Sequence, residues 1–115
     1  MTEDEEWTHL LAVLAPYGWK VETAEESELL TSASDGLFMG REQLREPART
    51  WLFASLKRRF LSTRRHLPEI SEDHRPRFLE TIEETRQLWN ALVSLGSVPD
   101  LIEVAPDLAA EDDPS

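Results

Sequence analysis

The stretch "GWKVETAEESELLTSASDGLFMGRE", residues 18–42, decides between two fold classes. Its first residues alternate between apolar and polar side chains, and the Asp-Gly pair at 35–36 is a strong signal for a hairpin turn. This pattern favours a small three-stranded antiparallel meander. A helix over residues 24–33 is the competing interpretation, because Thr23 and Glu26 also fit a capping box. We expect the meander, and therefore an α+β protein, with an all-α bundle as the alternative.

One amphipathic helix is predicted before the meander. Thr2 and Glu5 fit a capping box at its start, and Pro-Tyr-Gly at residues 16–18 ends it. Apolar side chains recur at helical spacing on one of its faces: Trp7, Leu10, Leu11 and Leu14. We expect that face to pack against the core.

A longer helix is predicted over residues 47–67, "PARTWLFASLKRRFLSTRRHL", which end just before Pro68. At about 100° per residue, one stripe of this helix is the expected core face: Leu52, Phe53, Leu56, Phe60 and Leu67. A second stripe, on nearly the opposite side, mixes apolar and basic side chains: Trp51, Ala54, Arg58, Leu61 and Arg65. Such a helix either lies between other elements or exposes its second stripe as an interface.

A third helix is predicted to end at Gly96 and to run antiparallel to the second. Its apolar side consists of six residues: Phe78, Ile82, Leu88, Trp89, Leu92 and Val93. Three acids are expected on its other side, where they could lie beside the basic helix: Glu80, Glu83 and Glu84.

Length and composition predict one ordered domain with a loose end. The chain has 115 residues and is 40% hydrophobic, which is enough for a core. We expect a single globular domain over residues 1–105 and a flexible acidic tail over residues 106–115, with a short Pro-Asp-Leu repeat at 99–101 and 106–108.

The chain carries no signal for a membrane or for secretion. No apolar run approaches the ~20 residues that cross a bilayer, and the N-terminus is acidic where a secretory signal is basic. Without cysteine there is no disulfide, thiolate nucleophile or thiolate metal site. We expect a cytoplasmic protein that does not bind membranes.

Charge is segregated along the chain, whose formal net charge is −11. Residues 1–40 carry nine acids and one base, residues 41–77 five acids and ten bases, and residues 78–115 nine acids and one base. The basic middle segment either complements the acidic segments within the fold or meets an anionic partner.

No residue pattern indicates an enzyme. The four glycines are too far apart for a phosphate-binding loop, and no Gly-x-Ser-x-Gly motif marks a nucleophile. His66 and His74 flank acidic residues, but at a spacing that matches no recognised metal site, and His9 is expected on a solvated helix face. We therefore expect no catalytic, metal-binding or cofactor-binding residues, and no motif identifies a family.

A protein partner is the favoured interpretation of the basic helix. Tryptophan and arginine are enriched at interface hot spots, and the second stripe offers four candidate partner-binding residues: Trp51, Arg58, Leu61 and Arg65. The chain would act as an adaptor, assembly factor or regulator that binds an acidic protein or a second copy of itself. The competing interpretation is that the meander or the C-terminal segment covers Trp51 and Leu61.

A nucleic-acid-binding regulator is the alternative function. A row of basic residues could track phosphates: Arg41, Arg45, Arg49, Lys57, Arg58, Arg59, Arg64 and Arg65. Two features oppose it. The arginines within the helix lie on different sides, and an overall pI of about 4.6 weakens long-range attraction to DNA or RNA.

Overall fold

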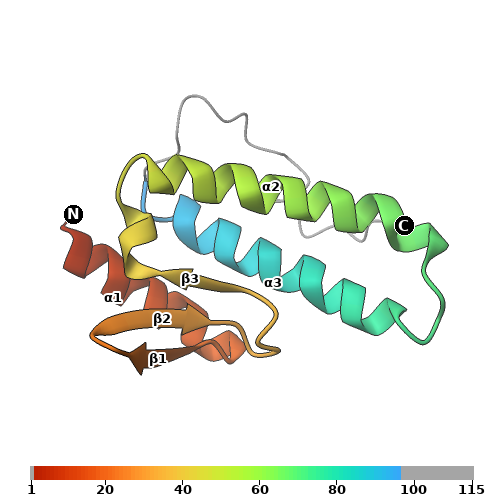
Figure 1. Ribbon diagram of the computed structural model, residues 1–115, viewed down its shortest axis with the longest axis horizontal. Helices are drawn as coiled ribbons and strands as arrows, with labels where there is room; N and C mark the ends of the chain where they lie inside the picture. Colours follow the sequence, from red (N-terminus) through yellow and green to blue (C-terminus); the bar gives the residue numbers. More distant parts are fainter. Residues whose placement is uncertain (1, 97–115) are drawn as a thin grey trace.

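The computed structural model describes residues 2–96, which form three α-helices and a three-stranded antiparallel sheet (Figure 1). The elements are α1 (Glu3–Leu14), η1 (Ala15–Tyr17), β1 (Lys20–Ala24), β2 (Ser27–Thr31), β3 (Phe38–Gly40), η2 (Arg41–Leu44), α2 (Ala48–His66), η3 (Leu67–Glu69) and α3 (Arg75–Val93), where η marks a short 3₁₀ helix. The expected α+β class is confirmed. The predicted acidic tail and the Pro-Asp-Leu repeat lie outside the described residues. None of the helices described is long and apolar enough to cross a membrane.

The meander has the strand order β1-β2-β3, so the competing helix over residues 24–33 is wrong. Lys20 pairs with Thr31 across the first hairpin, and Thr31 pairs with Phe38 across the second. Glu25 and Glu26 form the first turn with positive φ angles of 49° and 74°. Such turns usually contain Asn or Gly, so no typical dipeptide marked this one in the sequence.

The start of α1 has the predicted capping box. The Glu5 N–H donates to the Thr2 hydroxyl at 3.2 Å, and the Thr2 N–H donates back to the Glu5 carboxylate at 3.4 Å. The helix ends in the 3₁₀ turn η1, after which Gly18 takes a φ of 92°. That left-handed conformation favours glycine, which has no Cβ to clash.

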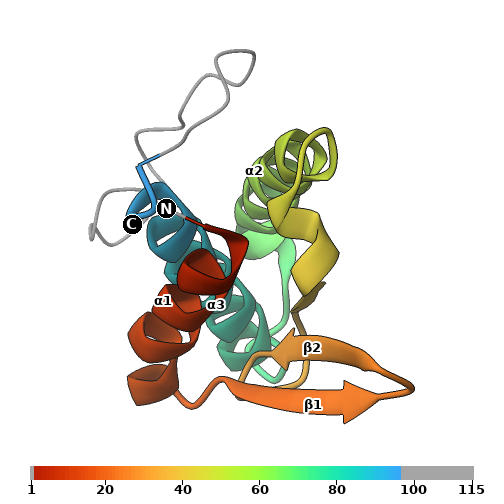
Figure 2. The ribbon, with the colours of Figure 1, turned by 90° about the vertical axis from the view of Figure 1, so that its left-hand side faces the viewer.

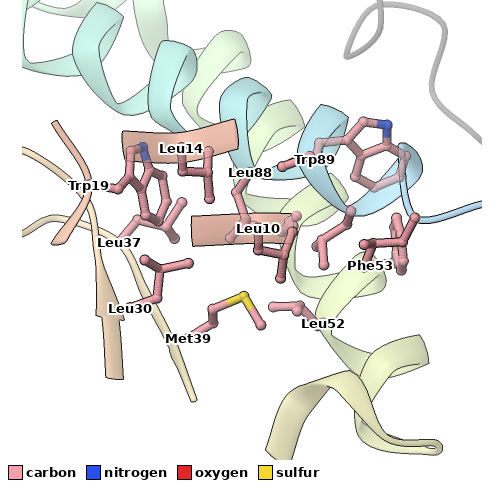
Figure 3. Packing of buried hydrophobic residues seen from close by; sticks show 14 of the residues in the cluster. Leu10, Leu14, Trp19, Leu30, Leu37, Met39, Leu52, Phe53, Leu88 and Trp89 are labelled. Carbon is pink, nitrogen blue, oxygen red and sulfur yellow. The ribbon is translucent and has the colours of Figure 1, made fainter. Parts of the chain in front are cut away.

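The core lies where the three helices meet one face of the sheet (Figure 3). Leu10 and Leu14 of α1 lie beside Leu30 and Met39 of the sheet, while the rings of Phe53 and Trp89 meet edge to face at 5.0 Å. The predicted core stripe of the second helix is confirmed, because all five residues are buried: Leu52, Phe53, Leu56, Phe60 and Leu67.

The two long helices, α2 and α3, run side by side and antiparallel, as expected (Figure 1). The sheet and α1 pack at one end of this pair, and η2 connects the end of β3 to the start of α2 (Figure 2). The third strand is therefore held close to the first turns of the basic helix.

Glu84 differs from the expectation that it lines the outer side of α3. It is buried, and its carboxylate accepts hydrogen bonds from the Ser34 N–H at 3.0 Å and the Ser34 hydroxyl at 2.6 Å. A buried carboxylate needs such donors. Glu84 thus fixes the loop between β2 and β3 instead of facing the basic helix.

Candidate interaction site

The first three arginines of the basic segment lie against the acidic start of α1. Arg41, in η2, places its Nε 3.3 Å from Glu3, and Arg45 pairs with the same carboxylate. Arg49, in α2, places its Nη2 2.6 Å from the Glu6 carboxylate. These arginines come from three different segments and not from one continuous helix. Much of the basic segment thus complements acids of the same chain.

The charges in this cluster stabilise one another. Hydrogen bonds from Arg45 and then Arg41 lower the pKa of Glu3, and the hydrogen bond to Glu3 raises the pKa of Arg45. The Thr2 hydroxyl likewise lowers the pKa of Glu5. All three groups stay ionised near neutral pH. The contacts of Glu3 with Arg41 and Arg45 attach the start of α1 to η2 and to the residue that follows it.

Some later bases of the segment also contact the rest of the fold. Arg59 donates from Nη2 to the Gly36 carbonyl at 2.9 Å, and the Arg64 guanidinium lies 5.9 Å from the centre of the Phe60 ring. Lys57 is half-buried. The predicted row of eight basic residues is therefore divided among several faces of the molecule.

Arg58 and Arg65 behave differently from these bases. Both are exposed, and within residues 2–96 neither side chain has an ion pair or a hydrogen bond. They lie on the same side of α2 as Trp51, which is 74% exposed, and Leu61, which is 41% exposed. We call Trp51, Arg58, Leu61 and Arg65 the Trp51 face. The meander leaves Trp51 and Leu61 exposed, so it does not supply the cover that one interpretation of the sequence expected; the C-terminal segment, the other cover named there, lies outside the described residues.

A groove adjoins the Trp51 face, between the β3 side of the sheet and α2. It has a volume of about 430 Å³, within the range in which proteins hold ligands. Its lining includes Gly36, Phe38 and Gln43 on one side and Trp51, Arg58 and Arg59 on the other. Leu61 and Arg65 do not line this groove; they continue the same face of α2 toward the end of the helix.

Phe38, like Gly36 and Gln43, is a groove residue that the sequence analysis did not identify. Its side chain is 61% exposed, whereas its neighbours Leu37 and Met39 are buried. The alternation of side chains along a strand could have predicted this exposure, because a residue between two core-facing neighbours points to the opposite face of the sheet. Gly36 and Gln43 had no comparable signal, since only the packing of the loop and η2 against α2 brings them to the groove.

A second hollow of about 420 Å³ lies between α1 and α3 and contains a histidine–serine contact. His9 Nε2 lies 2.9 Å from the Ser94 hydroxyl, which itself donates to the Ala91 carbonyl at 2.6 Å. The serine proton is therefore directed away from the imidazole, and His9 acts as the donor. This geometry does not activate a nucleophile. The partners lie 85 positions apart, so no spacing in the sequence could have indicated the contact.

Among the residues that the structure describes, no three histidine, aspartate or glutamate side chains gather as a metal site. His66 faces Glu69 at 3.8 Å, and His74 contacts Ser71 at 3.2 Å, so each has a neighbour in its own loop. The two histidines flanking the acidic residues do not form a shared centre in this part of the chain.

Comparisons of the chain with protein-family models, with curated proteins and with solved structures found no significant match.

Proposed function

We propose that this chain is a small, non-enzymatic interaction module of the cytoplasm, an adaptor, assembly factor or regulator, that binds an acidic protein through the Trp51 face. One observation carries the proposal: Trp51 is 74% exposed beside Arg58, which is unpaired within residues 2–96, whereas Arg41, Arg45 and Arg49 are paired with acids. A large exposed aromatic side chain adds little to the fold, but it gives contact area at an interface.

An acidic partner suits this face although the whole chain is negative. At physiological ionic strength charges are screened over about 8 Å, so an approaching carboxylate responds mainly to the nearest arginines. Arg58 and Arg65 each present a planar guanidinium that can hold a carboxylate through two hydrogen bonds. A second copy of this acidic chain is one protein that could fulfil that role.

The experiment is affinity capture of the tagged full chain from its native extract, run with and without nuclease, followed by calorimetry with the purified partner. Arg58→Glu together with Arg65→Glu reverses two charges on the Trp51 face. Arg75→Glu together with Arg77→Glu is the matched control, because it makes the same charge change in the first turn of α3. Acids are favourable at a helix N-terminus, so the control should remain folded.

We expect the first variant to lose the partner and the control to retain it, with unchanged circular dichroism for both. Equal binding by both variants would reject the Trp51 face as the site. Partners that disappear after nuclease treatment, or a binding constant that falls steeply with salt, would favour nucleic acid instead.

A further inference from the structure

We infer that the partner is recognised as an extended acidic peptide that adds to the free edge of β3 in the groove beside α2. This inference rests on the proposed function and specifies the conformation in which the partner binds. Three observations support it: the direction of the backbone groups of β3, the charges that line the groove, and the two exposed aromatic side chains at its walls.

The backbone of β3 directs one hydrogen-bonding residue into the groove. The Ser32 N–H donates to the Leu37 carbonyl at 2.8 Å, so Ser32 and Leu37 form a hydrogen-bonded pair of the antiparallel ladder. Such pairs alternate along a ladder. The next pair, Thr31 with Phe38, is therefore a non-hydrogen-bonded pair, in which the Phe38 N–H and carbonyl point away from β2.

Neighbouring contacts confirm which way this edge faces. Gly36 and Gly40 lie two positions before and after Phe38, so their backbone groups point away from β2 as well. The Gly36 carbonyl accepts a hydrogen bond from Arg59 of α2 at 2.9 Å, and the Gly40 N–H donates to Gln43 of η2 at 2.8 Å. Phe38 lies between them, and within residues 2–96 its N–H and carbonyl have no hydrogen-bond partner. An unpaired strand edge of this kind is a template for another extended chain.

A peptide in the groove must be extended to pair with both the N–H and the carbonyl of Phe38. A helix satisfies its N–H and carbonyl groups internally, so a bound helix would cover the Phe38 backbone without pairing with it. A strand placed opposite Phe38 supplies one carbonyl and one N–H at the required spacing. Because buried backbone groups need partners, the groove favours a strand over a helix.

The lining of the groove determines the side chains that fit. Among residues 2–96, the charged side chains that line it are Arg58 and Arg59, both positive, and Arg59 donates one of its five N–H groups to the Gly36 carbonyl. A carboxylate of the peptide can pair with Arg58. Phe38 and Trp51, 61% and 74% exposed, offer contact area for an apolar side chain. The expected ligand is therefore a short strand that combines acidic and apolar residues.

The first step of the test is to select nine-residue peptides from a random display library against the full-length chain. We expect enriched peptides to contain an acidic residue and to lose affinity about tenfold or more with Arg58→Glu, and to keep it with Arg77→Glu. If no peptide is enriched while a folded acidic protein still binds through Arg58, the extended ligand is wrong and the proposed function stands. If neither binds through Arg58, both are wrong.

The second step examines the backbone pairing directly. Methylating the peptide nitrogen that faces the Phe38 carbonyl should weaken binding about tenfold or more, whereas methylating either adjacent nitrogen should have a small effect. Saturating peptide should also slow hydrogen exchange of the Phe38 amide, while the Gly40 amide, already bound to Gln43, serves as the internal reference.

Other outcomes would overturn the inference. Binding that depends on Arg58 but tolerates every methylated nitrogen, with unchanged exchange at Phe38, rejects strand addition and leaves the proposed function intact. If the Phe38 amide is protected before peptide is added, the site is already occupied. If protection of the Phe38 amide falls on dilution, the occupant is a second copy of the chain. If it does not change on dilution, the occupant is residues 97–115 of the same chain.

Discussion

Arg49 and Glu6 form an ion pair that is almost closed off from water, with Nη2 and Oε2 2.6 Å apart. Their side chains are 9% and 13% exposed, respectively. The pair joins α2 to α1, which are separated by the whole meander in the sequence. One arginine of the basic segment is therefore part of the interior of the fold.

Removing Glu6 should destabilise the protein. Breaking a buried ion pair leaves one charge unpaired and typically costs about 3–5 kcal/mol. Because some exposure remains, we expect Glu6→Ala to lower the free energy of unfolding by about 2–3 kcal/mol, measured by urea denaturation. Glu6→Leu combined with Arg49→Leu should recover most of this loss, because no charge is then left unpaired. If the double variant is as unstable as Glu6→Ala, the pair itself is not what stabilises this contact.

Acid should weaken the attachment of α1 through Glu3. Hydrogen bonds from Arg45 and Arg41 lower the pKa of Glu3 in the folded protein below its unfolded value of about 4.3. The stabilisation is therefore present above that value and is lost as pH falls through the folded pKa. Glu3→Gln should be less stable than the natural chain at pH 7, and the two should converge in acid. If the unfolding free energies of the natural chain and of Glu3→Gln differ by the same amount at every pH, Glu3 does not stabilise the fold through its ionised form.

Trp51 and Phe53 lie two positions apart on α2 and should respond oppositely to truncation. Phe53 is fully buried against Trp89, so Phe53→Ala should cost about 3–5 kcal/mol through the cavity that it leaves. Trp51 is largely exposed, so Trp51→Ala should change stability by no more than about 0.5 kcal/mol. Thermal unfolding of the two variants measures both. A large loss for Trp51→Ala would mean that this side chain supports the fold.

The contact between Glu84 and Ser34 should fix the loop that precedes β3. Glu84→Ala leaves both the Ser34 N–H and its hydroxyl without their acceptor. Ser34 itself is exposed, so the expected cost is that of two ordinary hydrogen bonds at about 0.5–1.5 kcal/mol each, or about 1–3 kcal/mol in total. Ser34→Ala removes the hydroxyl bond to Glu84 and the 3.2 Å bond from the Gly36 N–H, but it keeps the loop attached to Glu84 through the backbone N–H of residue 34, so it should cost less. We also expect Glu84→Ala to speed hydrogen exchange at Phe38 and Met39, because the adjacent loop loses its attachment to α3. Equal stability of the two variants would reject this role.

Those parts of the fold that depend on local patterns were predictable. Capping at Thr2 and the core stripe around Phe53 depend on neighbours within a few residues. The Asp-Gly pair correctly indicated a loop between the second and third strands, but this loop spans four residues, 33–36, between the paired Ser32 and Leu37, and its turn is centred on residues 33–34. The Glu25-Glu26 turn was not predictable, because its residues do not favour the conformation that strand pairing imposes on them. The burial of Glu84 was not predicted, because helical periodicity shows which side of α3 it occupies but not that the loop between β2 and β3 packs against that side.

Prediction of the site was limited by the same difference between local and distant contacts. Helical spacing correctly grouped Trp51 with Arg58, and strand alternation could have added Phe38. Nothing local in the sequence indicated that Arg41 and Arg45 meet Glu3, about forty positions earlier. Those contacts reduce the predicted basic row to a smaller exposed face.

The most direct test of the central claim uses the indole N–H signals of the four tryptophans in a ¹H–¹⁵N NMR spectrum. Trp7 donates to Glu28 and Trp19 to Gln87, each at 2.8 Å, and Trp89 is fully buried, so these three should be insensitive to a ligand on α2. The acidic partner purified from the capture experiment is titrated into the full-length chain. The account predicts that the Trp51 signal alone shifts and saturates with the binding constant measured by calorimetry. A Trp51 signal that stays in place at saturation, while another indole signal moves, would contradict it.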